Sequence, residues 1–171
     1  ESDVFDVLLF AERDIETAKI PSFIKRIGSY AFNECFNLKE ITFSDDSQLE
    51  SIGKYAFFAS GFKFISIPRT VKRIEDSAFA FCKAKRIDFP EDTELEEICN
   101  DAFFECSIRS LSIPSTVVEL GEEWCKCVYK LRNISVMPGN KRYLYYNNSI
   151  VIGKSNLENE NYDLLLFAPR S

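Results

Sequence analysis

A short pattern recurs along most of this chain of 171 residues, and it is clearest at residues 71–89, V-K-R-I-E-D-S-A-F-A-F-C-K-A-K-R-I-D-F. An apolar residue is followed four places later by a residue pair, usually Ala-Phe, and a short alternating segment closes the unit. The leading residues are Ile27, Ile52, Ile74, Ile98 and Leu120, and the pairs are Ala31-Phe32, Ala56-Phe57, Ala78-Phe79, Ala102-Phe103 and Trp124-Cys125. The closing segments begin at Ile41, Ile65, Ile87, Leu111 and Ile134, in steps of 24, 22, 24 and 23 residues (65 − 41, 87 − 65, 111 − 87 and 134 − 111).

A period in the low twenties predicts a leucine-rich-repeat solenoid. We expect the α/β class: a right-handed solenoid in which each repeat supplies one short strand to a parallel concave sheet and a helical or 3₁₀ turn in its middle. Each repeat cannot bury its apolar face alone, so neighbouring repeats must stack to form a continuous core. The Ala residues should pack closely and the Phe residues should point inward.

Three segments follow from this pattern. In residues 1–14 we expect an N-terminal strand, which is either the end of a preceding β segment or a cap. We expect about five repeats of roughly 22–25 residues in residues 15–136, and a β-hairpin that forms a small β segment or C-terminal cap in residues 137–171. A longer period is also visible, because D-V-L-L-F-A-E-R-D aligns Asp6 with Asp163 of D-L-L-L-F-A-P-R-S, an offset of 157 residues (163 − 6). The alternative is a chance likeness between two apolar strands.

Composition narrows the classes of partner. Hydrophobic residues make up 46% of the chain, which is enough for a core and argues against disorder. The net charge of −6 disfavours nucleic acid and anionic membranes as partners, because an acidic chain repels phosphate groups. No apolar run approaches the length that spans a bilayer. We therefore expect no nucleic-acid partner, no direct membrane insertion of this segment, and a monomer.

Residue types argue against catalysis. The chain has no histidine, which removes Ser-His-Asp and Cys-His nucleophile activation and His-based metal sites. Its six glycines are scattered, so no phosphate-binding loop is visible. A paired-carboxylate site is not excluded by residue type, but Asp45-Asp46 and Glu91-Asp92 fall where acidic turn residues are expected. We expect no enzyme activity, no cofactor and no metal.

Six cysteines invite a disulfide or zinc interpretation. Cys35, Cys82 and Cys106 share one repeat position, three residues after the Phe, where a buried free thiol packs as a small apolar side chain. The alternative is a disulfide between Cys82 and Cys106, which lie in adjacent repeats.

Two N-glycosylation sequons also occur, at Asn133 and at Asn147.

The alternation of each closing segment indicates which residues face outward from the sheet. Solenoids present such positions as an extended binding surface, and an exposed Phe64 beside Arg86 has the chemistry of an interface hot spot. Phe64 could instead only cover a neighbour. The outward residues are Glu40, Thr42, Phe64, Ser66, Arg86, Asp88, Ser110, Ser112, Asn133 and Ser135.

Two charged columns accompany the strands. One is uniformly basic and would capture acidic protein or glycan groups, unless it is only a solvated rim; it comprises Lys39, Lys63, Lys85, Arg109 and Arg132. In the other, stacked neighbours mostly carry opposite charges, which predicts a ladder of surface ion pairs. That column comprises Lys25-Arg26, Glu50-Ser51, Lys72-Arg73, Glu96-Glu97 and Val118-Glu119.

The repeat also resembles a known family. Residues 20–43, I-P-S-F-I-K-R-I-G-S-Y-A-F-N-E-C-F-N-L-K-E-I-T-F, are similar to the BspA-like leucine-rich repeat, I-P-x-x-V-x-x-I-G-x-x-A-F-x-x-C-x-x-L-x-x-I. The resemblance extends over residues 20–136, with departures at Ser60, Val128 and the Trp124-Cys125 pair. Residues 137–171 resemble a segment interspersed among such repeats in parasitic protists.

The resemblance implies a surface or secreted protein whose repeats bind a protein or glycan ligand in adhesion to host cells or matrix. The alternative is a structural spacer, with no ligand of its own, in a larger repeat protein.

Overall fold

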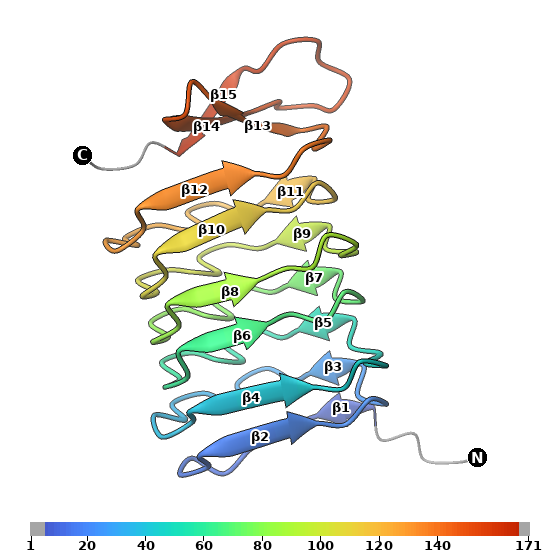
Figure 1. Cartoon of the computed structure of the whole chain (residues 1–171), viewed down its shortest axis with the longest axis vertical. Helices are drawn as coiled ribbons and strands as arrows, with labels where there is room; N and C mark the ends of the chain where they lie inside the picture. The colour runs from blue at the N-terminus through green and yellow to red at the C-terminus, as the bar shows by residue number, and fades with distance from the viewer. Residues whose placement is uncertain (1–5, 168–171) are drawn as a thin grey trace.

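The computed structural model describes residues 6–167 as a column of stacked turns with a small sheet at its C-terminal end (Figure 1). Residues 1–5 of the expected N-terminal strand and residues 168–171 of the expected C-terminal segment lie outside the described part. Within that part the chain forms fifteen strands, β1 to β15, and no helix. The repeat solenoid is therefore confirmed, but the expected α/β class is wrong, because the solenoid is built from strands and turns.

A six-stranded parallel sheet forms one side of the column. Each of its strands has two residues, and in all but the first strand the second residue is one of the apolar leading residues. The strands, in spatial order, are β1 (Val7–Leu8), β3 (Arg26–Ile27), β5 (Ser51–Ile52), β7 (Arg73–Ile74), β9 (Glu97–Ile98) and β11 (Glu119–Leu120). The expectation of one strand per repeat is thus wrong, since each repeat contributes two.

The closing segments form the expected parallel strands on the other side of the column (Figure 1). They are β2 (Thr17–Ile20), β4 (Glu40–Phe43), β6 (Phe64–Ser66), β8 (Arg86–Asp88), β10 (Ser110–Ile113) and β12 (Asn133–Val136). The ladder is interrupted once, so that β2 and β4 form a two-stranded sheet and β6 to β12 form a four-stranded sheet. Together with β1, β2 adds a solenoid turn before the five repeats.

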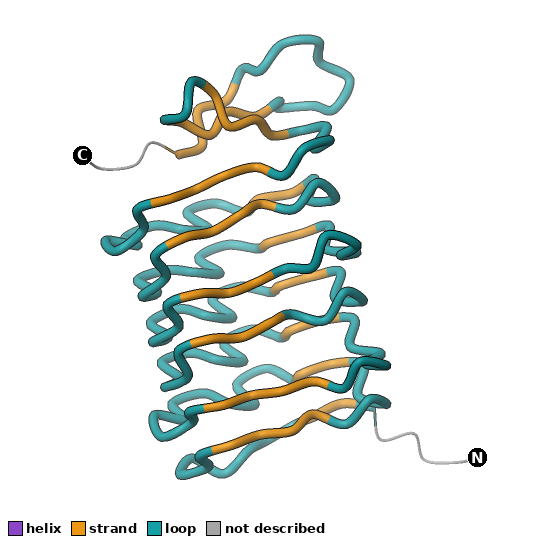
Figure 2. Tube along the Cα trace, in the orientation of Figure 1, coloured by secondary structure: helices purple, strands orange, loops and turns teal. Residues whose placement is uncertain are grey.

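The middle of each repeat is a turn, not the helical or 3₁₀ segment that the pattern predicted (Figure 2). Two residues four places apart adopt a left-handed backbone in each repeat; Ser77 has φ 53° and Phe81 has φ 57°. The Ser77 and Phe81 N–H groups then donate to carbonyls of the next repeat, at 2.9 and 2.8 Å. Backbone bonding runs along the stack between repeats, which a continuous helix would prevent. Since residues 6–167 contain no helix, no helical segment there could cross a bilayer.

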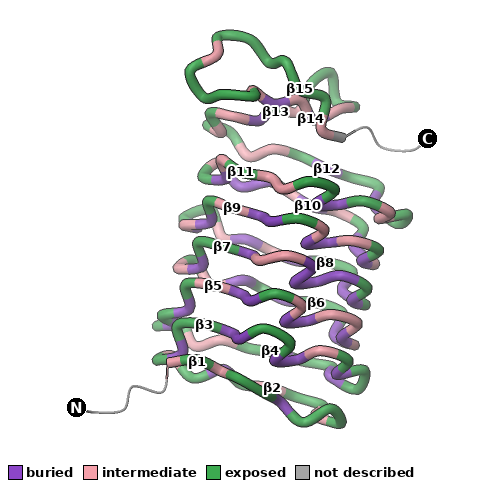
Figure 3. The backbone as a smooth tube through the Cα atoms, turned by 180° about the vertical axis from the view of Figure 1, so that it is seen from behind, coloured by how far each residue is buried: buried purple, intermediate pink, exposed green. Residues whose placement is uncertain are grey.

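The core lies between the six-stranded sheet and the strands on the other side of the column, and it continues into the turns (Figure 3). Phe32, Phe57, Phe79 and Phe103 are fully buried and stack ring on ring, with centroids 5.2, 5.2 and 5.7 Å apart. Trp124 ends the row, edge-on to Phe103 at 6.3 Å. The paired alanines are also fully buried, because only a small side chain fits where successive turns approach each other closely.

A three-stranded antiparallel sheet follows the solenoid: β13 (Tyr143–Tyr146), β14 (Ile150–Gly153) and β15 (Leu164–Phe167). Asn147 and Asn148 are both left-handed and turn β13 into β14, as two-residue hairpins require. Asn140 fastens this sheet to the last repeat, because its side-chain amide donates to the carbonyls of Pro114 and Val117, at 2.8 and 3.0 Å.

Tyr143 provides the buried anchor of the small sheet. Its hydroxyl accepts the Leu120 N–H at 3.0 Å and lies 3.3 Å from the Val118 carbonyl, to which it donates. We expect Tyr143→Phe to lower the free energy of unfolding by about 1 kcal/mol, because the partly buried Leu120 N–H loses its acceptor, whereas the Val118 carbonyl still accepts the Arg142 guanidinium at 2.7 Å. Thermal unfolding beside Tyr146→Phe, whose side chain is exposed, measures the effect. Equal melting temperatures for the two variants would contradict the anchoring role.

Candidate functional site

The outward residues of β4, β6, β8, β10 and β12 form a continuous surface that we call the strand face. The alternate residues Ile41, Ile65, Ile87, Leu111 and Ile134 are buried beneath it. Of the ten outward residues, Asp88, Ser110 and Ser112 are partly buried and the other seven are exposed. From β6 to β12 the strands are parallel and paired, so that outward residues of neighbouring strands lie side by side; Phe64 lies opposite Arg86, and Ser66 opposite Asp88.

The centre of the strand face is a cluster of Phe64, Arg86 and Asp88. The Arg86 guanidinium lies 4.6 Å from the centre of the Phe64 ring, and its Nε is 3.0 Å from the Asp88 carboxylate. Phe64 remains 45% exposed. The cluster therefore presents an aromatic surface and a cation that is already oriented. The sequence predicted the Phe64–Arg86 contact but missed the ion pair, although residues two apart on one strand share a face.

Two hollows flank this cluster. One, of about 410 Å³, lies where the ladder between β4 and β6 is interrupted, and Thr42, Phe64, Arg69 and Asp92 contribute to its lining. The other, of about 320 Å³, lies over β8, β10 and β12 and includes Asp88, Ser112, Asn133 and Ser135. The pattern of the strands did not predict Arg69 or Asp92 as lining residues, because both belong to turns that follow a strand. A glycan on Asn133 would cover the second hollow.

Basic side chains line a shallow hollow of about 210 Å³ beside the strands, which we call the basic groove. Its lining residues are Lys63, Lys83, Lys85, Ser107, Arg109 and Lys130. The backbone holds part of this row in register, because the Lys85 N–H donates to the Lys63 carbonyl at 2.8 Å and the Arg109 N–H to the Lys85 carbonyl at 3.0 Å. Strand spacing thus sets successive cations about 4.8 Å apart at the backbone.

Not every residue of the predicted basic column belongs to the groove. Lys39 lies one repeat before the groove and forms an ion pair with Glu16 at 2.8 Å. Arg132 is not among the residues that line the groove. Lys83 and Lys130, in contrast, line the groove and were missed. Lys83 and Lys130 each lie two residues before a member of the basic column, Lys85 and Arg132. This spacing was the sequence signal that could have identified them. None of the five cations of the groove forms an ion pair within residues 6–167.

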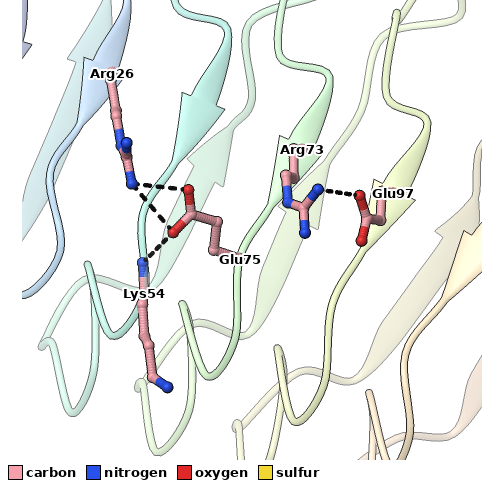
Figure 4. A network of polar contacts seen from close by, with 5 residues as sticks. All are labelled: Arg26, Lys54, Arg73, Glu75 and Glu97. Atoms are coloured by element: carbon pink, nitrogen blue, oxygen red, sulfur yellow. Dashed lines mark hydrogen bonds and ion pairs between the residues drawn. The ribbon is translucent and has the colours of Figure 1, made fainter.

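The second charged column, Lys25-Arg26 to Val118-Glu119, includes strand residues of the six-stranded sheet, and we call it the mixed column. Its charges are partly paired (Figure 4). Arg73 pairs with Glu97 of the next repeat at 2.6 Å, as predicted. Arg26 faces Ser51 and instead reaches Glu75, two repeats away, at 3.0 Å. The predicted ladder is otherwise incomplete, because Lys25, Glu50, Lys72 and Glu96 make no ion pair in the described part of the chain. Positive charge is therefore balanced in part on this side and unbalanced in the basic groove.

The cysteines form no evident reactive centre. All six are free thiols, and only Cys127 is not buried. The Sγ atoms of Cys82 and Cys106 lie 2.9 Å apart as two hydrogen-bonded thiols and not as the alternative disulfide. Burial, together with the carboxylate of Glu97, raises the pKa of Cys99 to about 12, which suppresses the nucleophilic thiolate. Among the described residues, no three His, Cys, Asp or Glu side chains gather as metal ligands.

Burial raises the pKa of Cys125 to about 12 from an ordinary value near 9.0. The folded state then holds this proton more tightly than the unfolded state. The resulting stability is complete below pH 9 and is lost as the pH rises towards 12. We expect the stability difference between the parent and Cys125→Ala to shrink by up to about 1.4 kcal/mol per pH unit above pH 9. Urea unfolding from pH 7.5 to 10.5 measures this difference, and a constant value would contradict the expectation.

Comparison with known proteins agrees with this architecture. A family model described as a BspA type leucine rich repeat region matches residues 6–60 and 50–162, in six copies, which confirms the resemblance found in the sequence. No curated protein matches the chain.

Solved structures include similar solenoids. The chain is 30% identical to the pneumococcal vaccine antigen PcpA, with a TM-score of 0.76 over 81% of this chain and 34% of PcpA. A leucine-rich repeat protein from Eubacterium ventriosum is 29% identical, with a TM-score of 0.71 over 84% of this chain and 37% of that protein. A leucine rich cell surface protein from Faecalibacterium prausnitzii shares the fold, at 22% identity and a TM-score of 0.64 over 90% of this chain and 46% of that protein. The chain thus spans less than half of each protein.

Proposed function

Because the chain belongs to the BspA-type leucine-rich-repeat family, we propose that it is a ligand-binding module of a cell-surface or secreted protein. The ligand is an acidic protein or an anionic glycan, and the module contributes to adhesion to host cells or matrix. The surface location draws support from PcpA, which is described as a vaccine antigen. We assign the module no enzyme activity.

One observation carries the proposal: an exposed aromatic–cation cluster lies beside a basic groove, on a chain whose net charge is −6. Phe64 and Arg86 provide the aromatic and guanidinium groups that are enriched at the centres of binding interfaces. The groove supplies cations without local counterions, so an anionic ligand would gain charge-assisted contacts there. Lys63 and Lys85 directly precede Phe64 and Arg86 in β6 and β8, so one extended ligand could contact both surfaces.

The experiment is saturable binding of the purified protein to intact epithelial cells. We expect Phe64→Ser/Arg86→Glu and Lys63→Glu/Lys85→Glu each to weaken binding by about tenfold or more, because central interface residues contribute about 2 kcal/mol or more each. The matched control is Lys25→Glu/Lys72→Glu, which changes the net charge by the same amount as the groove variant, at exposed positions of the mixed column. All variants must match the parent in thermal stability.

The binding results distinguish the strand face and the basic groove from other surfaces of the protein. Loss of binding in both test variants, with retention in the control, supports the proposal. Equal binding by all four proteins would place the ligand elsewhere on the molecule. No binding by the parent favours the alternative function, a structural spacer. The uninterrupted apolar core from the first turn to the last favours that second candidate, because a spacer requires only continuous stacking.

A further inference from the structure

The last solenoid turn, residues 121–128, contains backbone donors that have no acceptor within residues 6–167. In the preceding repeat, the Phe103 and Glu105 N–H groups donate to the carbonyls of Trp124 and Lys126, at 2.8 and 3.1 Å. The equivalent donors of the last turn are the N–H groups of Cys125 and Cys127, and neither has an acceptor within residues 6–167. In every earlier repeat, the equivalent backbone N–H groups donate to carbonyls of the next repeat. The last turn therefore presents the same donors to whatever packs on the end of the stack.

A hollow of about 590 Å³ lies over this turn. Its lining combines the turn itself with Leu131 and with Leu165 and Leu166 of β15. Leu165 is 68% exposed. Within residues 6–167, the end of the stack thus combines backbone donors that have no acceptor with the exposed apolar side chain of Leu165.

The opposite end of the solenoid is complementary. The Ala11 N–H donates to the Ala31 carbonyl at 2.9 Å, as the Phe32 N–H does to Ala56 at 2.7 Å, so Ala11 occupies the place of Phe32 in its repeat. The Phe10 carbonyl then occupies the place of the Ala31 carbonyl, and it accepts no hydrogen bond in the described structure. Leu9 and Phe10 are 76% and 64% exposed. This end offers the Phe10 carbonyl and apolar surface where the other end offers donors and a hollow.

The sequence connects the two ends. Residues 6–14 and 163–171 are identical at six of nine positions, namely Asp, Leu, Leu, Phe, Ala and Arg. In structural terms, residues 7–8 form β1, which opens the solenoid, whereas residues 164–167 form β15, which closes the small sheet. One edge of β15 is paired with β14, and one edge of β1 is paired with β3. A single strand of this sequence could therefore serve both roles at once.

We propose that this chain is a stacking unit, and that its last turn is the binding surface for the first turn of a second copy that continues the same polypeptide, with residues 6–14 of the second copy in the place of residues 163–171 of the first. In the stack, the shared strand closes the small sheet of one unit and opens the solenoid of the next, with a repeat of 157 residues (163 − 6). The Cys125 N–H group donates to the Phe10 carbonyl of the next unit, and the Cys127 N–H group lies at the Glu12 carbonyl, which within its own unit accepts the Ile15 N–H at 3.3 Å and the Cys35 thiol at 3.6 Å. Leu9 of that unit takes the place of Leu166 in the lining of the hollow. This inference is independent of the ligand proposed above.

The test is a direct fusion in which residue 162 of one copy is joined to residue 6 of the next. Amide hydrogen exchange is measured at residues 121–129 of the first unit and compared with the single chain. We expect exchange at Cys125 and Cys127 to slow by about tenfold or more, because these amides become hydrogen-bonded within the stack. Unchanged exchange, with both solenoid cores protected, would overturn the proposal.

Two controls make the result specific. Two full chains joined through a flexible Gly-Ser linker after residue 171 should exchange as the single chain does, and equal protection there would overturn the 157-residue register. Leu9→Asp in the second unit should abolish the protection in the direct fusion. In the single chain the same substitution should leave the melting temperature unchanged, because Leu9 is 76% exposed. Retained protection in the Leu9→Asp fusion would also overturn the proposal.

Discussion

Phe79→Ala is expected to lower the free energy of unfolding by about 3–5 kcal/mol, the usual cost of removing a buried ring and leaving a cavity. Phe79 is fully buried, and its ring stacks between Phe57 and Phe103, with Phe62 edge-on at 6.5 Å. The stacked backbones on both sides hold these neighbours in place, so the cavity can close only in part. For a chain of this size the loss corresponds to a fall in melting temperature of roughly 6–20 °C.

Phe81→Ala is the matched control. Phe81 lies two residues further along the same turn, and its ring also contacts rings of the two adjacent repeats, Phe58 and Phe104, at 5.2 and 5.3 Å. Its side chain is 42% exposed, so we expect a cost of about 1 kcal/mol or less. Thermal melts of the two variants side by side measure the difference. If Phe79→Ala melted no lower than Phe81→Ala, the inward stack of phenylalanines would not be the core of the solenoid.

Gly61→Ala is expected to destabilise the protein by about 2–3 kcal/mol through overpacking. A Cβ atom at Gly61 would collide with the carbonyl oxygen of Phe36 and lie 3.1 Å from that of Leu38. Both belong to the backbone of the preceding repeat, which no side-chain rotation can move aside. The two turns would have to separate, which would also stretch the 3.0 Å bond from the Gly61 N–H to the Cys35 carbonyl.

Gly139→Ala separates this steric effect from a conformational one. Gly139 has φ 86° but no atom within 4 Å of an added Cβ. Its replacement should cost only about 1–2 kcal/mol, from the left-handed backbone alone. Urea unfolding of both variants distinguishes the two causes. Hydrogen exchange should also rise around residues 35–38 in Gly61→Ala and stay unchanged there in Gly139→Ala. A Gly61→Ala protein with the stability of the parent would show that the repeats are less closely spaced than described.

The stacking that these two variants test also positions the candidate binding surfaces. Phe64 meets Arg86 because β6 and β8 are in parallel register, and the cations of the basic groove follow the same spacing. A variant that separates repeats near Gly61 should therefore weaken ligand binding as well as stability. Binding variants must accordingly be compared at matched thermal stability.

The amino-acid pattern alone determined the repeat length, the inward residues and the outward positions of the longer strands. Ile65 and Ile87 are buried and Phe64 and Arg86 are exposed, as the alternation predicts. This succeeds because burial of side chains leaves a direct periodic signal in a sequence. The antiparallel pairing of β13 with β14 was also predictable, because Asn147 and Asn148 tolerate the left-handed backbone that the turn requires.

Only the tertiary structure decided where the backbone hydrogen bonds go and which charges meet. A two-residue strand such as β7 is too short for alternation to reveal it, and left-handed residues such as Ser77 and Phe81 have no distinctive sequence signal. The partner of Arg26 depended on Ser51 being too short and uncharged to pair with it, so that Glu75, two repeats away, came within 3.0 Å. Lys83 and Lys130 joined the basic groove because the turns bring them beside the column. Periodicity reports the environment of each side chain, whereas these contacts depend on distances between chain segments that only the packed stack establishes.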